Sequence, residues 1–136
     1  MKIFSKIIVY ARMVKFSHTI FALPFALSSM VLVNSVKPLD VATVFWIIVS
    51  MAGARTAAMG FNRIADAVID AKNPRTAIRE IPKGVISGWE AMLFTILASM
   101  LFIFASAMLS RLCFWLSFPV LLFLFAYSYT KRVTWL

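Results

Sequence analysis

Polar residues along this chain are confined to a few short segments, and long apolar runs separate them. A helix that crosses a hydrocarbon layer of about 30 Å needs about 20 mostly apolar residues. The segment at about 70–88 contains two prolines and two glycines and is predicted to be a polar loop. The apolar runs around it predict an all-α fold, a multi-pass transmembrane helical bundle with helices at about 16–36, 41–69, 89–109 and 113–129.

The overall composition agrees with a membrane protein. Hydrophobic residues make up 62% of the 136 residues, and the mean hydropathy is +0.92, whereas soluble domains are nearer half apolar. A net charge of +9 would suggest nucleic acid as the partner of a soluble protein. Here the basic residues flank the apolar runs, so we expect the lipid bilayer as partner and no nucleic acid. The single cysteine, Cys113, excludes an internal disulfide.

The distribution of Lys and Arg predicts the orientation in the membrane. Eleven of them lie in the N-terminal segment, the loop between the second and third helices, and the C-terminal end. Only Lys37 and Arg111 lie on the opposite side, and Arg55 lies within the second helix. Because cytoplasmic loops carry the excess of basic residues, both termini and the central loop are predicted to be cytoplasmic.

Four polar residues of the second predicted helix share one face. Asn62, Asp66 and Asp70 follow one another at four-residue intervals, and Arg55 lies seven residues before Asn62. At about 100° per residue, all four fall within a stripe roughly 80° wide. Ionisable groups inside a membrane are costly and by default mark a functional site, and oxygen ligands of this kind suit Mg²⁺ shared with phosphates. The alternative is structural: Arg55 pairs with Asp66 or a neighbour, and Asp70 is a loop charge.

The fourth predicted helix adds a second polar group. Tyr127 and Lys131 are four residues apart near its cytoplasmic end, and Arg132 follows. This helix runs in the same direction as the second, so these residues are predicted at the membrane depth of Asp66 and Asp70. Carboxylates and cations at one depth suit a metal–diphosphate pair. Topology alone would also place Lys and Arg at this helix end.

Two further features have structural interpretations. His18, the only histidine, has no evident partner for base catalysis, and an interfacial or packing role is expected. Small residues in the second helix have the spacing that favours close helix packing: Gly53, Ala54, Ala57, Ala58 and Gly60.

The central polar segment also resembles a known motif. The segment NRIADAVIDAKNPRTAIREIPKG, residues 62–84, is similar to the first Asp-rich motif of the UbiA superfamily of intramembrane aromatic prenyltransferases. It is particularly similar to the 4-hydroxybenzoate polyprenyltransferase branch and its menaquinone-pathway relatives. ARMVKFSHTIFALPFAL, residues 11–27, resembles the family's first helix, and YSYTKRVTWL, residues 127–136, resembles the end of its fourth.

The resemblance implies an enzyme that transfers a polyprenyl group from its diphosphate to an aromatic acid such as 4-hydroxybenzoate, in ubiquinone or menaquinone biosynthesis. It implies a location in the inner (plasma) membrane of a bacterium. By motif position, Asn62, Asp66 and Asp70 would hold Mg²⁺ and the diphosphate. Arg55 would lie near the acceptor or the diphosphate. Tyr127 and Lys131 would lie near the diphosphate and the reactive carbon, and Arg132 near the diphosphate.

The sequence departs from the family pattern in one respect. The resembled family has about nine helices and two Asp-rich motifs, whereas this chain has four predicted helices and no aspartate after Asp70. We therefore expect an N-terminal portion that is inactive alone, with the missing half on a continuation or a separate chain.

Two alternatives to an enzyme half stay open at this point. One is a small four-helix membrane transporter, although the first predicted helix has no acidic residue to couple protons. The other is a non-catalytic membrane subunit that supports a separate prenyltransferase half.

Overall fold

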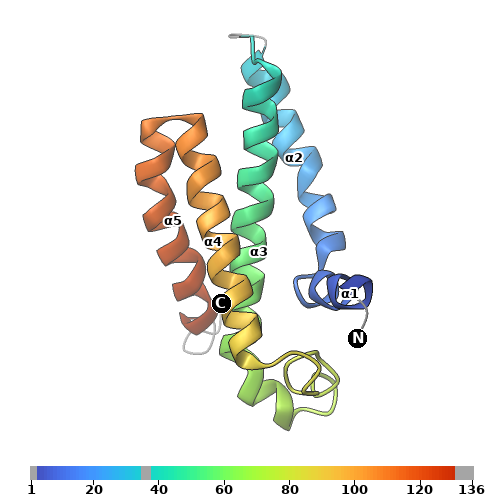
Figure 1. Cartoon of the computed structure of the whole chain (residues 1–136). Helices are drawn as coiled ribbons and strands as arrows, with labels where there is room; N and C mark the ends of the chain where they lie inside the picture. Colours follow the sequence, from blue (N-terminus) through green and yellow to red (C-terminus); the bar gives the residue numbers. More distant parts are fainter. Residues whose placement is uncertain (1–2, 35–37, 131–136) are drawn as a thin grey trace.

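The computed structural model describes residues 3–34 and 38–130, and these residues form a bundle of helices without strands (Figure 1). The bundle confirms the predicted all-α membrane fold. The side chains of residues 3–5, 16, 18, 19, 22, 33 and 34 are outside the description. The helices are α1 (Ile3–Met13), α2 (Phe16–Asn34), α3 (Val41–Lys72), α4 (Gly88–Leu109) and α5 (Arg111–Thr130).

Three of the described helices are long and apolar enough to cross a membrane, namely α3, α4 and α5. The first predicted span corresponds to α2, which continues through Pro24 for 19 residues. Among the described side chains of α2, residues Leu23–Leu32 form an apolar stretch. The spans therefore establish an integral membrane protein.

The helix α1 was not predicted from the sequence. Its 11 residues are too few to cross a membrane, and in the sequence its Lys6 and Arg12 indicate only the orientation of the protein. Val9, Tyr10 and Met13 nevertheless follow helical spacing, and they pack against the rest of the protein. Lys15 follows in a left-handed backbone conformation, with φ of 49°, at the turn between α1 and α2.

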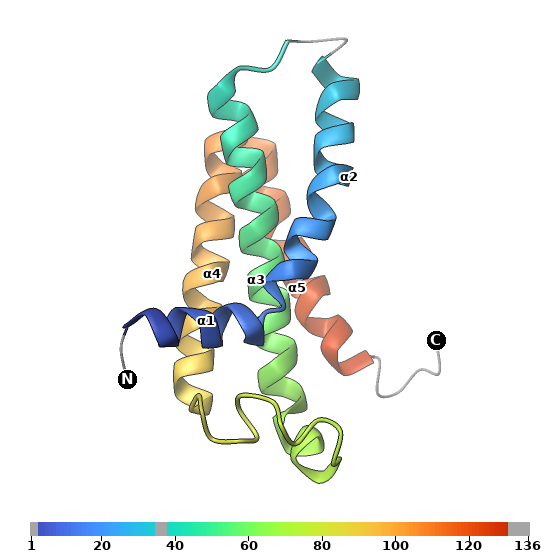
Figure 2. The same cartoon turned by 90° about the vertical axis from the view of Figure 1, so that its right-hand side faces the viewer.

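Different segments of the chain lie at the two ends of the bundle. Helix α1, the 73–87 loop and the C-terminal end of α5 gather toward one end, whereas the α2–α3 and α4–α5 connections lie toward the other (Figures 1 and 2). The helices α3 and α5 consequently run in the same direction, as the sequence predicted. At the far end, Asp40 precedes α3, and a hydrogen bond from the Thr43 hydroxyl lowers the pKa of the Asp40 carboxyl.

The helix α3 is longer than a membrane span requires. Its 32 residues extend over about 48 Å at 1.5 Å per residue, against a hydrocarbon thickness of about 30 Å. The apolar part comes first, so about 20 residues from Val41 onward fill the span. The remaining turns, from about residue 61 to Lys72, extend toward the 73–87 loop.

Small residues allow α3 to pack most extensively against α4. Gly53, Ala57 and Gly60 are buried on this face of α3. A Cβ atom on Gly53 would lie 3.1 Å from the backbone nitrogen of Phe102, and a Cβ on Gly60 would lie 2.4 Å from Thr95 Oγ1. The predicted packing role of these residues is therefore visible in the structure.

A methyl group at position 60 should therefore destabilise the bundle. We expect Gly60→Ala to lower the free energy of unfolding by about 1–3 kcal/mol, because the added Cβ overlaps Thr95 Oγ1. Either the Thr95 hydroxyl turns away from its hydrogen bond to the Ala91 carbonyl oxygen, or the two helices separate. Unfolding of the purified protein in mixed detergent micelles measures the change.

Two variants control this prediction. Gly60→Ala combined with Thr95→Ala removes the overlapping oxygen and should cost less than the sum of the two single changes. Gly88→Ala has open space around the new Cβ and should leave stability nearly unchanged. Additive losses in the double variant would contradict the proposed contact.

Candidate functional site

The polar stripe predicted on the second helix lies on α3, on the side away from α4. Arg55, Asn62 and Asp66 are half-buried, and at about 100° per residue they lie roughly opposite the packed face of Gly53 and Gly60. This placement follows from the small residues, since α4 packs on the face of α3 that carries Gly53, Ala57 and Gly60. The stripe is therefore left on the side of α3 that faces away from α4.

Arg55 lies within the apolar part of α3 and has an incomplete set of hydrogen bonds. Its Nε atom is buried and has no hydrogen-bond partner in the described structure. Within residues 3–34 and 38–130, the structure shows no ion pair between Arg55 and Asp66. A buried donor without a partner is costly and calls for an explanation. An acceptor from a ligand would supply the missing bond.

Asp70 is held at the end of α3 by the loop that follows. It is 6% exposed, and its Oδ2 accepts a hydrogen bond from Arg79 Nη1, which also makes an ion pair. The Thr76 hydroxyl donates to the Asp70 carbonyl oxygen at 3.1 Å. Asp70 is thus a buried, paired carboxylate rather than a free loop charge, and Arg79 is a partner that the sequence analysis did not single out.

Arg63 is a second residue that the sequence analysis treated only as a cytoplasmic charge. It is buried, and its Nε donates to the carbonyl oxygen of Met13 at 3.0 Å. Met13 ends α1, so this bond satisfies a helix-end carbonyl and joins α1 to α3 beside Asn62. Its position between Asn62 and Asp66 in the motif was the available signal, but its partner lies 50 residues away.

Aromatic contacts between α3 and α5 show which parts of the two helices lie at the same level along the bundle. The ring of Phe61 stacks on Phe125 with centroids 4.4 Å apart and meets the edge of Tyr129 at 5.9 Å. Asn62 and Tyr127 are sequence neighbours of these rings and therefore lie at similar depth. Tyr127 itself is 68% exposed and lines an apolar concave surface of α5 with Val120, Phe123, Leu124, Ala126 and Thr130.

Three predicted residues receive no structural description. Lys131 and Arg132 lie outside the described residues, and so does the side chain of His18. Their proposed positions thus stay predictions.

The side-chain oxygens of the polar stripe determine which kind of metal site α3 could form. In the described part of the chain, no three His, Cys, Asp or Glu side chains lie close enough together to hold a metal ion. Mg²⁺ bound with a substrate phosphate commonly takes only one or two protein carboxylates and keeps several waters. On α3, Asn62 and Asp66 supply an amide and a carboxylate oxygen one turn apart, whereas the Asp70 carboxylate is paired with Arg79.

These observations define a class: an integral membrane protein with several spans and a stripe of ionisable residues at one membrane boundary. The chain belongs to the UbiA prenyltransferase family, whose model matches residues 22–136. This result confirms the resemblance found in the polar motif. It favours a prenyltransferase over the small transporter.

A solved structure gives an independent comparison. The apo structure of a UbiA homolog from Aeropyrum pernix K1 is 36% identical to this chain and superposes with a TM-score of 0.78. The match covers 85% of this chain and 42% of the homolog's chain, so this chain spans less than half the homolog's length. A search of curated proteins found no match.

Replacing Arg79 should loosen the 73–87 loop. Arg79→Gln leaves the buried Asp70 carboxylate without its ion-pair partner. Loss of one partner of a fully buried pair costs several kcal/mol, but the Arg79 side chain is 31% exposed. We therefore expect the free energy of local opening of the loop to fall by about 1–2 kcal/mol. Faster amide hydrogen exchange across residues 73–87 measures this change.

Two variants test whether the ion pair is the cause. Arg75→Gln removes an exposed cation of the same loop and should leave exchange unchanged. The double variant Asp70→Asn with Arg79→Gln should exchange more slowly than Arg79→Gln alone, because no uncompensated charge is left. Equal exchange in Arg75→Gln and Arg79→Gln would exclude a role for the pair.

Proposed function

We propose that this chain forms part of an intramembrane prenyltransferase site, which transfers a polyprenyl group from polyprenyl diphosphate to an aromatic acid. The observation that carries the proposal is the buried Arg55 Nε without a partner, on the same face of α3 as Asn62 and Asp66. An anionic substrate group would satisfy this donor, and either an aromatic carboxylate or a diphosphate has the required oxygens.

The position of the stripe along α3 suits a substrate with one charged and one apolar end. Arg55 falls within the first 20 residues of α3, which fill the hydrocarbon span, whereas Asp66 and Asp70 fall beyond it. A diphosphate would bind near the carboxylates at the membrane boundary. The isoprenoid tail would lie along apolar helix surfaces within the bilayer.

Mg²⁺ is the proposed cofactor, and when bound it would stabilise the negative charge that develops on the departing diphosphate. Asn62 and Asp66 would bind it through their oxygens, and Asp70 would contribute if its carboxylate exchanges Arg79 for the metal. The diphosphate is also proposed to be bound by residues of α5 and of the segment that follows it, namely Tyr127, Lys131 and Arg132. Arg55 would orient the acceptor ring toward the allylic carbon, in a cavity that excludes water and so favours ring attack over hydrolysis.

The finer assignments are part of the same proposal. The acceptor would be 4-hydroxybenzoate or a related quinone precursor, and the protein would lie in the inner membrane of a bacterium with its termini in the cytoplasm. Since this chain spans 42% of the matched homolog, the complete site would require the rest of the family fold. Either a continuation of this chain or a separate chain would supply it.

Substitution of Asp66 tests the metal–diphosphate assignment. We expect Asp66→Asn to weaken Mg²⁺-dependent binding of geranyl diphosphate at least about tenfold, because one anionic ligand is lost. Equilibrium dialysis of the purified chain in nanodiscs measures this binding. Asp40→Asn is the matched control, because Asp40 precedes α3 at the opposite end of the bundle and is exposed. Similar losses in both variants would contradict a specific role for Asp66.

Transfer activity tests the need for the remaining part of the fold. With geranyl diphosphate, Mg²⁺ and 4-hydroxybenzoate, the 136-residue chain should form little or no prenylated product. Product analysis by chromatography checks this expectation. Turnover comparable to that of a full-length family member would show that this chain suffices.

A further inference from the structure

Helix α1 is bound to the bundle by one of its faces. It runs across the spans rather than along them (Figure 2). Met13 is fully buried with Ile86 and Ala91, and Val9 packs against the same cluster. The ring of Tyr10 stacks on Phe94 of α4, with centroids 4.9 Å apart. These contacts hold α1 firmly against α4 and the end of the 73–87 loop.

The level of α1 along the bundle coincides with the membrane boundary. Its buried cluster includes Met59 and Ile64 of α3. Counting about 20 residues of span from Val41 places the end of the hydrocarbon layer close to residue 60. A helix that packs at this level and runs across the spans lies in the plane of the bilayer surface.

The face of α1 opposite its packed face is apolar and exposed. Ile7 and Ile8 are 59% and 44% exposed, and their angular positions lie away from Val9 and Met13. Leu93 and Leu97 of α4 are exposed apolar residues too, and they belong to a helix long and apolar enough to cross the membrane. Because Tyr10 of α1 stacks on Phe94 of the same helix, α1 lies beside a span that carries exposed apolar side chains.

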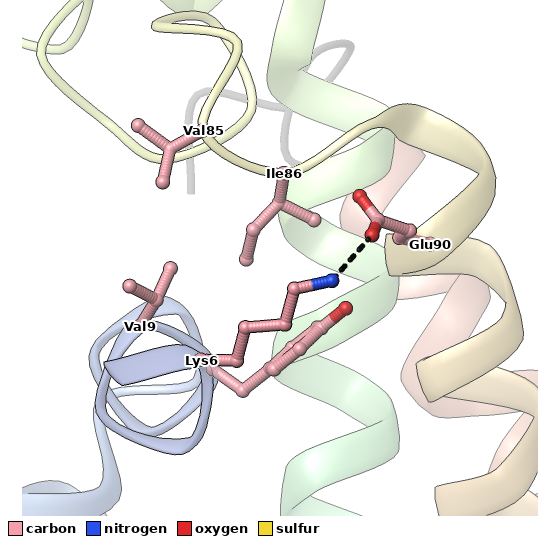
Figure 3. A pocket seen from close by; sticks show the side chains of 6 residues that line it. Lys6, Val9, Val85, Ile86 and Glu90 are labelled. Carbon is pink, nitrogen blue, oxygen red and sulfur yellow. Dashed lines mark hydrogen bonds and ion pairs between the residues drawn. The ribbon is translucent and has the colours of Figure 1, made fainter. Parts of the chain in front are cut away.

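The charges on α1 are all of one sign among its described side chains. Lys6 reaches Glu90 of α4, with Nζ and Oε1 3.4 Å apart (Figure 3). Arg12 and Lys15 are exposed, and within the described chain no ion pair is recorded for either. Two unpaired cations at the boundary of a bilayer match the phosphates of anionic lipid headgroups.

We propose that α1 is an in-plane membrane helix that binds anionic phospholipid. Ile7 and Ile8 insert into the boundary between headgroups and acyl chains, and Arg12 and Lys15 bind the headgroups. The hydrogen bond from Arg63 Nε to the Met13 carbonyl connects this lipid-bound helix to α3 beside Asn62. The lipid surface thereby braces the helix that carries the polar stripe, whatever reaction that stripe supports.

A depth measurement tests the insertion of α1. The full chain with Cys113→Ser receives a single Ile7→Cys substitution, labelled with a fluorophore, in nanodiscs that contain acyl-brominated phospholipid. Two probes serve as references. Leu97→Cys, in a span, gives the quenching expected within the lipid, and Lys83→Cys, exposed in the loop, gives the quenching expected in water. Quenching at position 7 should be close to that at position 97. Quenching as weak as at position 83 would overturn the proposal.

A second measurement tests the preference for anionic lipid. In mixed nanodiscs, the probe at position 7 should be quenched more by brominated phosphatidylglycerol than by brominated phosphatidylcholine. Arg12→Gln with Lys15→Gln should reduce the association constant for phosphatidylglycerol relative to phosphatidylcholine about thirtyfold, given about 1 kcal/mol for each of the two cations at an anionic surface. Arg111→Gln, at the opposite end of the bundle, should leave it unchanged. Equal quenching by the two lipids, or equal effects of the variants, would overturn the assignment of headgroup binding.

Discussion

The close approach of α3 and α4 sets the rotation of α3 about its own axis, and the candidate site depends on that rotation. Gly60 brings the α3 backbone so near to Thr95 that even a methyl group would overlap its hydroxyl oxygen. Because the small residues and the polar stripe lie on opposite faces of α3, burying one face turns the other away from α4. Membrane helices associate without a strong hydrophobic driving force, so such close packing decides which faces meet.

The length of α3 determines where that stripe lies relative to the bilayer. Its 32 residues exceed a span of about 20 residues by about 12, so one continuous helix carries Arg55 within the hydrocarbon and Asp70 beyond it. Local contacts then hold this protruding end from two sides. Arg79 pairs with Asp70 from the loop, and Arg63 bonds to the end of α1. Two basic residues of the motif thus support the position of its acidic ones.

The sequence predicted much of this arrangement because most of its signals are local. Apolar run length identified α3, α4 and α5, and the four-residue spacing of Asn62, Asp66 and Asp70 placed them on one side of a helix. The sequence pattern did not predict the helix α1, because its short apolar face is interrupted by basic residues. Those residues also indicate the orientation of the protein in the membrane. The partners of Asp70 and Arg63 could not be predicted, because a charged residue in a sequence gives no indication of which distant group it will contact.

The sequence by itself determined the membrane class, the family and the shared face of the polar stripe, because hydropathy, motif spacing and helical periodicity depend only on neighbouring residues. Only the tertiary structure decided that α4 covers the opposite face of α3, that Arg55 Nε is buried without a partner, and that α1 lies across the bundle. These features depend on contacts between residues far apart in the chain, such as Lys6 with Glu90 and Met13 with Arg63. Packing in three dimensions selects such pairs, and no local pattern encodes them.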